Sequence, residues 1–231
     1  MFESEAGGGA DSLGRARAAL RIAERRVGVQ HRDQVIPLAP PEPDPLTELL
    51  PDGDLPRGAT LIVRDSASLL GWLLGVTQGD RWVALVGWPA LGLVALSEAG
   101  VDLEHVVAVP DVRGIAAQVL AALGDGFEIV VVGPKVLLTA GERRRLLARA
   151  RQRGTAIITP QAWEGAVAML DVERTRWSGP DRGGGWIREA QLTVTRRSRV
   201  DGAGSRFDVT RQGARAPTVT APRIATVRRT S

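Results

Sequence analysis

The chain has 231 residues, of which 44% are apolar, and it carries 30 lysines and arginines against 26 aspartates and glutamates. A chain of this length and composition can bury the core of one compact domain and keep further segments outside it. It has no cysteine and only two histidines, which excludes disulfides and thiolate sites and leaves too few ligands for an all-histidine site. We therefore expect no metal and no other cofactor.

The net charge of +4 is unevenly distributed along the chain. From residue 196 onward there are nine arginines and two aspartates, so the C-terminal segment is basic. Lys135 is the only lysine, a bias more typical of a GC-rich genome than of selection for phosphate contacts. The N-terminus lacks the apolar region of a secretory signal, and no uncharged run reaches the roughly 20 residues that span a bilayer. These features predict a cytoplasmic protein that does not contact membranes.

The first predicted element is an amphipathic helix over residues 12–28, where Leu13, Leu20 and Val27 fall on one apolar stripe. This stripe needs a partner, so the segment is a candidate docking helix for another protein or for a second copy of the chain. Half of the 14 prolines then lie in a short stretch around LTELL. Because proline removes a backbone donor and disfavours helix before it, we expect an N-terminal helical arm at 1–36 and an extended linker at 37–56.

From residue 57 onward, short β-branched runs alternate with Ala- and Leu-rich stretches, the pattern of parallel strands joined by helices. Since the strands are continuously apolar, both faces of the sheet should be covered. The expected strands are 59–63, 82–86, 105–109, 127–132 and 155–159, and the expected helices are 67–77, 90–99, 112–123 and 140–153. The last helix begins with a capping box, Thr139 and Glu142, and stops at Gly154.

After residue 161 the pattern changes to alternating polar and apolar residues. Residues 167–174 and 187–196 predict an antiparallel hairpin across a Gly-rich turn, and 206–210 adds a candidate third strand. The remaining segment has few large apolar residues, so 211–231 is expected to be a disordered basic tail. The fold class is thus α/β, with a core at 57–210.

A nucleotide-binding loop would be expected where the first strand meets its helix, with the sequence G-x-x-x-x-G-K-[ST]. Neither the entrance glycine nor the lysine followed by Ser or Thr is present there, and the side chains that take their place favour dry packing and helix capping over phosphate binding. Gly71 and Gly75 predict close packing of this helix on the sheet. The degenerate loop comprises Arg64, Asp65, Ser66, Ala67, Ser68, Leu69, Leu70, Gly71 and Trp72.

The order of these elements resembles the RecA-like core over about residues 50–200. The resemblance rests on LPRG before the first strand, EAGVDLEHVVAVP, FEIVVV, TAIITPQ, and the paired segments LDVERTRW and QLTVTRRSR. It implies a RecA-like sheet flanked by helices. It also exposes the losses: Pro89 stands near the position of the catalytic glutamate, and Gly133 follows FEIVVV where a Walker B aspartate would end the strand. Together with the missing Walker A lysine, they predict a pseudo-ATPase and not an enzyme.

Within that superfamily the chain resembles the ImuA-type proteins, in particular the actinobacterial ImuA′ branch. The resemblance implies a non-catalytic accessory subunit of the DNA-damage-induced (SOS) mutagenic translesion apparatus. Its partners would be the Y-family-like protein ImuB and an error-prone C-family DNA polymerase, with association with the nucleoid during DNA damage. The connections at 133–139 and 160–165 are too short for the long DNA-binding loops of RecA, so filament formation on single strands is not expected.

Two groups of side chains are candidate contacts with DNA or a partner. Arginines of the helix at 140–153 could face phosphates or be an ordinary solvated face, and the tryptophans flanking SGPDRGGG could stack on bases or stabilise the hairpin. Arginines of the tail could add salt-dependent attraction. The candidates are Arg143, Arg144, Arg145, Arg149, Arg176, Trp177, Arg182, Trp186, Arg223, Arg228 and Arg229.

Two alternatives to the adaptor hypothesis stay open at this stage. One is an atypical nucleotide-binding ATPase of the RecA superfamily, supported only by GATLIVRDSAS. The other is a DNA-binding or SulA-like regulator of cell division that uses the arm and the tail.

Overall fold

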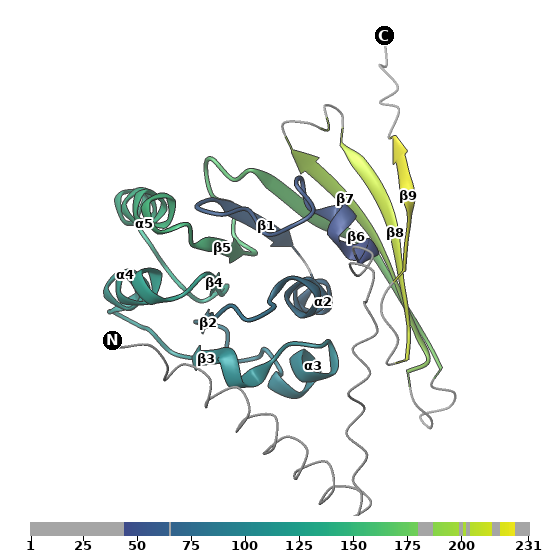
Figure 1. Ribbon diagram of the computed structural model, residues 1–231, viewed down its shortest axis with the longest axis horizontal. Helices are drawn as coiled ribbons and strands as arrows, with labels where there is room; N and C mark the ends of the chain where they lie inside the picture. Colours follow the sequence, from purple (N-terminus) through teal and green to yellow (C-terminus); the bar gives the residue numbers. More distant parts are fainter. Residues whose placement is uncertain are drawn as a thin grey trace, which may run out of the picture. The chain divides into compact units, whose positions relative to one another are not determined.

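The computed structural model describes residues 44–64, 66–179, 187–198, 201, 204–213 and 218–224. The predicted arm at 1–36 lies outside these ranges, together with Leu13, Leu20 and Val27. Within them, a nine-stranded sheet has the order β3-β2-β4-β5-β1-β6-β7-β8-β9 (Figure 1). The α/β fold class predicted from the sequence is therefore confirmed.

The parallel part of the sheet agrees with the predicted strands and helices to within a few residues. Its strands are β1 (Thr60–Arg64), β2 (Val83–Val86), β3 (Val106–Val109), β4 (Ile129–Val132) and β5 (Ala156–Thr159). Helices α2 (Ala67–Thr77), α3 (Leu93–Glu98), α4 (Ala116–Gly126) and α5 (Ala140–Arg153) connect them, and a 3-10 turn, η2 (Leu103–His105), precedes β3. The capping box of α5 is present, with the Glu142 N–H donating to the Thr139 hydroxyl at 3.3 Å.

The antiparallel part begins at β6 (Ala168–Ser178), which is parallel to β1 on one side and antiparallel to β7 (Glu189–Ser198) on the other. Strand β8 (Ser205–Gln212) pairs with β7, and β9 (Thr218–Ile224) pairs with β8, both antiparallel. The predicted hairpin is confirmed, and the sheet continues beyond it.

The two faces of the parallel sheet are covered by different helices: α4 and α5 lie on one side, and α2 and α3 on the other (Figure 1). Alternate residues of the central strands point to each side. Val83 and Leu85 belong to the apolar cluster under α2, whereas Ala84 and Val86 belong to the cluster under α4 and α5. This two-sided burial explains why the strands read as continuously apolar.

The expectation of an extended linker at 37–56 is wrong for its second half. Residues 45–49 form a 3-10 helix, η1 (Pro45–Leu49), whose first turn is capped by the Asp44 carboxylate accepting from the Leu46 N–H at 2.9 Å. Leu46, Leu49, Leu50 and Leu55 are buried in the cluster with α2 and the antiparallel strands. Proline is tolerated at the first helical position. Burial of the leucines of LTELL therefore stabilises the 3-10 helix, and the prolines lie only at its ends and beyond.

The expectation of a disordered tail from residue 211 is also wrong where the tail is described. Residues 211 and 212 end β8, and β9 pairs with β8. Val219 packs against the apolar cluster, and Thr218 and Thr220 suit a pleated strand. Pro222 lacks an N–H, which an edge strand tolerates because its outer side needs no ladder bond. The core therefore extends from residue 44 to residue 224.

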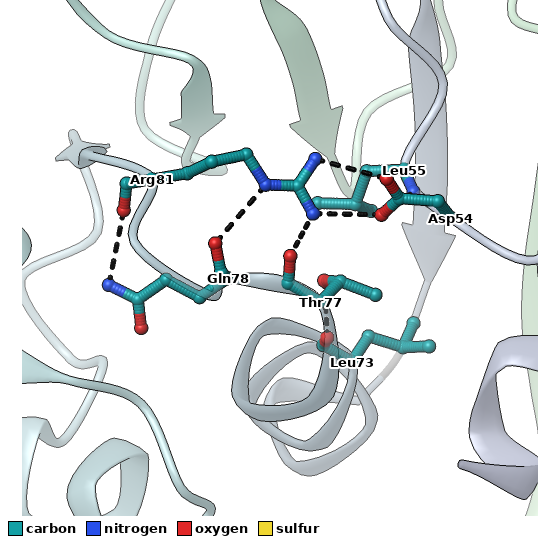
Figure 2. Close-up of polar contacts among 6 residues, drawn as sticks. All are labelled: Asp54, Leu55, Leu73, Thr77, Gln78 and Arg81. Atoms are coloured by element: carbon teal, nitrogen blue, oxygen red, sulfur yellow. Dashed lines mark hydrogen bonds and ion pairs between the residues drawn. The ribbon is translucent and has the colours of Figure 1, made fainter. Parts of the chain in front are cut away.

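Arg81 ties the end of α2 to the segment before β1 (Figure 2). Its guanidinium lies between the Asp54 carboxylate, with Nη2 2.8 Å from Oδ1, and the carbonyl oxygens of Thr77 and Gln78. The Gln78 side chain also exchanges two hydrogen bonds with the backbone of Asp102. Arg81 thus donates to the last carbonyl groups of α2 and, through Asp54, links the helix to the segment before β1.

We predict that Arg81→Ala lowers the free energy of unfolding by about 2 kcal/mol, because the two helix carbonyls and Asp54 lose a charged donor together. Arg57→Ala, an arginine in the same segment as Asp54, should change stability by less than about 0.5 kcal/mol. Urea unfolding of both variants checks this. Equal losses would show that the Arg81 contacts add nothing to stability.

A second network fixes the connection between β7 and β8. Asp201, whose side chain is only 4% exposed, accepts from Arg196 at 2.7 and 2.9 Å and from the hydroxyls of Ser198 and Ser205. Arg196 also donates to the Glu48 carbonyl oxygen at 2.7 Å, which joins the network to η1. Hydrogen bonds from Arg196 first, and then from the two serines, lower the pKa of Asp201 to about 2.

This depressed pKa predicts an acid-sensitive contribution to folding. Because the carboxylate is stabilised in the folded state, the contribution is complete above the unfolded pKa near 3.8 and is lost as the pH falls through about 2. Asp201→Asn should cost about 2 kcal/mol at neutral pH and progressively less between pH 4 and 2. Unfolding measured against pH would contradict this if wild type and variant gave parallel curves.

Candidate functional site

The first candidate is the junction between β1 and α2, where nucleotide-binding α/β proteins hold phosphates at a helix N-terminus. Here the Ser66 hydroxyl accepts from the Leu69 N–H at 3.0 Å and so caps the helix. Leu69, Leu70 and Trp72 are buried, with at most 5% of each exposed, in the cluster between helix and sheet. Asp65 lies outside the described residues. The described part of the loop therefore caps the helix with a hydroxyl and buries its apolar side chains in the core.

The carboxyl ends of β2 and β4 pack directly on each other. The Gly133 N–H donates to the Val86 carbonyl oxygen at 2.7 Å. A Cβ atom added to Gly133 would lie 2.4 Å from the Gly87 carbonyl oxygen and 2.8 Å from the Trp88 Cβ. A Cβ added to Gly87, which has φ +68°, would meet the Val136 side chain at 2.3 Å. The neighbouring backbone therefore leaves no space for a side chain at Gly133, the position that the RecA-like resemblance gives to a Walker B aspartate.

Pro89 occupies a tight turn between β2 and α3. The Leu91 N–H donates to the Trp88 carbonyl oxygen at 3.1 Å, which makes Pro89 the second residue of the turn. Proline favours this position because its φ is already fixed. Pro89 thus supports the turn that brings Trp88 against Gly133.

Gly71 and Gly75 allow close packing, but against a helix and not against the sheet. A Cβ on Gly75 would lie 2.1 Å from the Ala99 carbonyl oxygen, and one on Gly71 would lie 3.1 Å from the Leu96 side chain. The prediction of close helix–sheet packing is corrected accordingly: the two glycines fit α2 against α3 and the residue that follows it.

The second candidate is the row of arginines on α5, and the structure separates them. Arg143 lies over the Trp163 ring at 5.8 Å and donates to the Ala162 carbonyl oxygen. Arg149 pairs with Asp125 of α4, with its Nε 2.7 Å from Oδ1, and this contact lowers the pKa of Asp125. Arg144 is exposed and donates to the Ala140 carbonyl oxygen one turn back. Arg145 is exposed and makes no hydrogen bond or ion pair with the described residues.

The third candidate, around the β6–β7 turn, is not one surface. Arg176 lies opposite Gln191, on the outer face of the sheet, and Trp177 lies opposite Ala190, on the inner face. Trp177 is 50% exposed. Arg182, Trp186, Arg228 and Arg229 lie outside the described residues, as does the side chain of Arg223 in β9. The two described members therefore cannot act on one ligand from the same face.

Sequence reasoning missed one feature, a groove between α4 and α5 with a volume of about 380 Å³. It depends on how two helices lie side by side, which no local pattern shows.

In the described part of the chain, no group of three or more histidine, aspartate or glutamate side chains is placed to hold a metal ion. None of the described helices has the length and apolar character needed to cross a membrane.

The described residues define a mixed α/β protein with a mostly parallel sheet and a closed carboxyl edge at β2 and β4. Residues 48–165 match the model of the family described as MT3502 N-terminal domain, and the chain belongs to this family. An uncharacterized protein of Mycobacterium tuberculosis, Rv3395c, is 35% identical over 128 residues. That match covers 53% of this chain and 63% of the relative, which is less than two thirds of the relative's length.

A solved structure, SulA from Pseudomonas aeruginosa, is also similar over part of the chain. It has 24% sequence identity and a TM-score of 0.33, and the match covers 43% of this chain and 92% of that one.

Proposed function

We propose that the protein is a non-catalytic, RecA-like accessory subunit that acts as an adaptor in DNA-damage-induced mutagenic translesion synthesis. Its partners in this proposal are ImuB and an error-prone C-family DNA polymerase, at the nucleoid during DNA damage. The motifs that resemble the ImuA′ branch support this assignment.

The observation that carries the non-catalytic part is the packing at Gly133. A nucleotide hydrolase of this class needs a carboxylate for Mg²⁺ at the end of the strand, a lysine and backbone N–H groups for the phosphates. At Gly133 the neighbouring backbone leaves no space even for a Cβ atom. At the start of α2, Ser66 already accepts from a helix N–H, and leucines take the place of the phosphate-binding residues. The sheet is kept, but its carboxyl edge at β2 and β4 is closed by packing. This supports a role in contacting other proteins and not in hydrolysing nucleotides.

An affinity pull-down from DNA-damaged cells tests the adaptor role. The tagged full chain should recover ImuB and the polymerase together from cells treated with a DNA-damaging agent, and the recovery should not depend on added ATP or Mg²⁺. Deletion of its gene should lower damage-induced mutation without changing survival of undamaged cells. Recovery of division proteins in place of polymerase components would contradict the proposal.

Direct DNA binding is a second candidate, favoured by the exposed Arg144 and Arg145 on α5. If DNA were the main ligand, affinity for duplex DNA would fall steeply with salt, and both arginines would contribute to the slope. Fluorescence anisotropy with labelled duplex at two salt concentrations distinguishes this from a protein adaptor.

A further inference from the structure

The groove between α4 and α5 has an apolar floor and a charged rim. Its floor is formed by the buried side chains of Leu120, Leu138 and Leu146. The hollow has a simple cause, since α4 presents Ala117 and Ala121, one helical turn apart, where larger side chains would fill the space. At about 380 Å³ it lies at the lower end of the volumes that hold ligands.

The charges on the rim are not equivalent. The Arg149 guanidinium is held by Asp125, and the Glu142 carboxylate accepts from the Thr139 backbone N–H at 2.7 Å as part of the helix cap. Arg145 has no such partner, since it makes no hydrogen bond or ion pair with the described residues. The pKa of Glu142 is lowered first by the hydrogen bonds from Thr139 and only then by the charge of Arg145. Among the described residues, the groove therefore offers Arg145 as a cation without a hydrogen-bonded partner beside an apolar surface.

We infer that this groove binds an amphipathic helical segment of a partner protein, with large apolar side chains on the floor and a carboxylate against Arg145. Charge complementarity selects an acidic segment, and the apolar floor between two helices suits the mode in which a helix lies in a groove. DNA fits this surface less well, because the apolar floor offers nothing to phosphates. The inference rests on the proposed adaptor function only for the identity of the natural partner.

A synthetic probe tests the groove without that identity. The full chain is titrated into a fluorescein-labelled peptide with leucines at helical spacing flanked by glutamates. Two further peptides replace every glutamate by lysine or every leucine by serine. We expect saturable binding of the first peptide, and binding at least about tenfold weaker for each of the others.

The variants place the peptide on the protein. Arg145→Glu should weaken binding at least about tenfold, and Arg145→Lys should retain most of it, because the charge is kept. Arg151→Glu is the matched control: it makes the same charge change on the same helix, outside the groove, and should leave affinity unchanged. Ala121→Trp should block binding by filling the groove, and unfolding curves establish that each variant is folded.

Several results would overturn the inference. Equal binding of all three peptides would show an unspecific surface, and an unchanged affinity in Arg145→Glu and Ala121→Trp would place the peptide elsewhere. If Arg145→Glu lost binding to duplex DNA but kept its affinity for the peptide, α5 would contact DNA and not a helical partner. Loss of a dimer in Arg145→Glu, measured by light scattering, would make a second copy the occupant. If the peptide results hold but ImuB and the polymerase are not recovered, the groove stands and the proposed function fails.

Discussion

Gly133→Asp, which places a carboxylate at the end of β4, should lower the free energy of unfolding by more than about 3 kcal/mol. The added Cβ would lie 2.4 Å from the Gly87 carbonyl oxygen, so either β2 or β4 must shift. The shift is opposed by the hydrogen bond from the Gly133 N–H to Val86.

Gly126→Asp is the matched control, because a Cβ on Gly126 meets no atom within 4 Å. It should change stability by less than about 1 kcal/mol. If Gly133→Asp is recovered only in aggregates, Gly133→Ala makes the same test with a smaller side chain and should still be clearly destabilised. Wild-type stability in both Gly133 variants would show that the carboxyl edge is open.

Gly75→Ala should be the second large effect, a loss of about 2–3 kcal/mol. Alanine favours a helix over glycine by about 1 kcal/mol, so the intrinsic preference of α2 acts in the opposite direction. The new methyl group would lie 2.1 Å from the Ala99 carbonyl oxygen, which belongs to the backbone and can retreat only if α3 moves.

The control is Gly126→Ala, the same substitution at the end of α4. Because space is free there, helix preference alone should act, and the variant should be neutral or slightly stabilised. Opposite signs for two identical substitutions in one chain, measured by urea unfolding, would attribute the loss to the α2–α3 contact. A stabilised Gly75→Ala would contradict this packing.

Local patterns predicted most of the parallel half of the sheet. The residue ranges of α2 and α5 were predicted from periodicity and caps, since Ser66 and Thr139 act within a few residues of the N–H groups they satisfy. The alternation of strand residues also implies that Arg176 and Trp177 point to opposite faces of the sheet. The two residues are candidates together only because they are neighbours in the chain, and that grouping does not take the alternation into account.

What the sequence did not predict depends on contacts between distant segments. Strand β9 forms because β8 offers it an edge, and η1 is held by a sheet face that lies more than a hundred residues further along the chain. The pairing of Arg149 with Asp125, and hence the availability of Arg145, depends on α4 and α5 lying side by side. Patterns in local sequence do not reveal such pairs.

Isothermal titration of the full chain with ATP and Mg²⁺ tests the central claim most directly. A RecA protein with intact Walker motifs, titrated under the same conditions, serves as the positive control. We predict no saturable binding for this chain up to about 1 mM ATP, because Ser66 caps α2 and Gly133 leaves no space for a magnesium ligand. Saturable binding, or ATP hydrolysis that is lost on substitution of Arg64 or Ser66, would contradict the account.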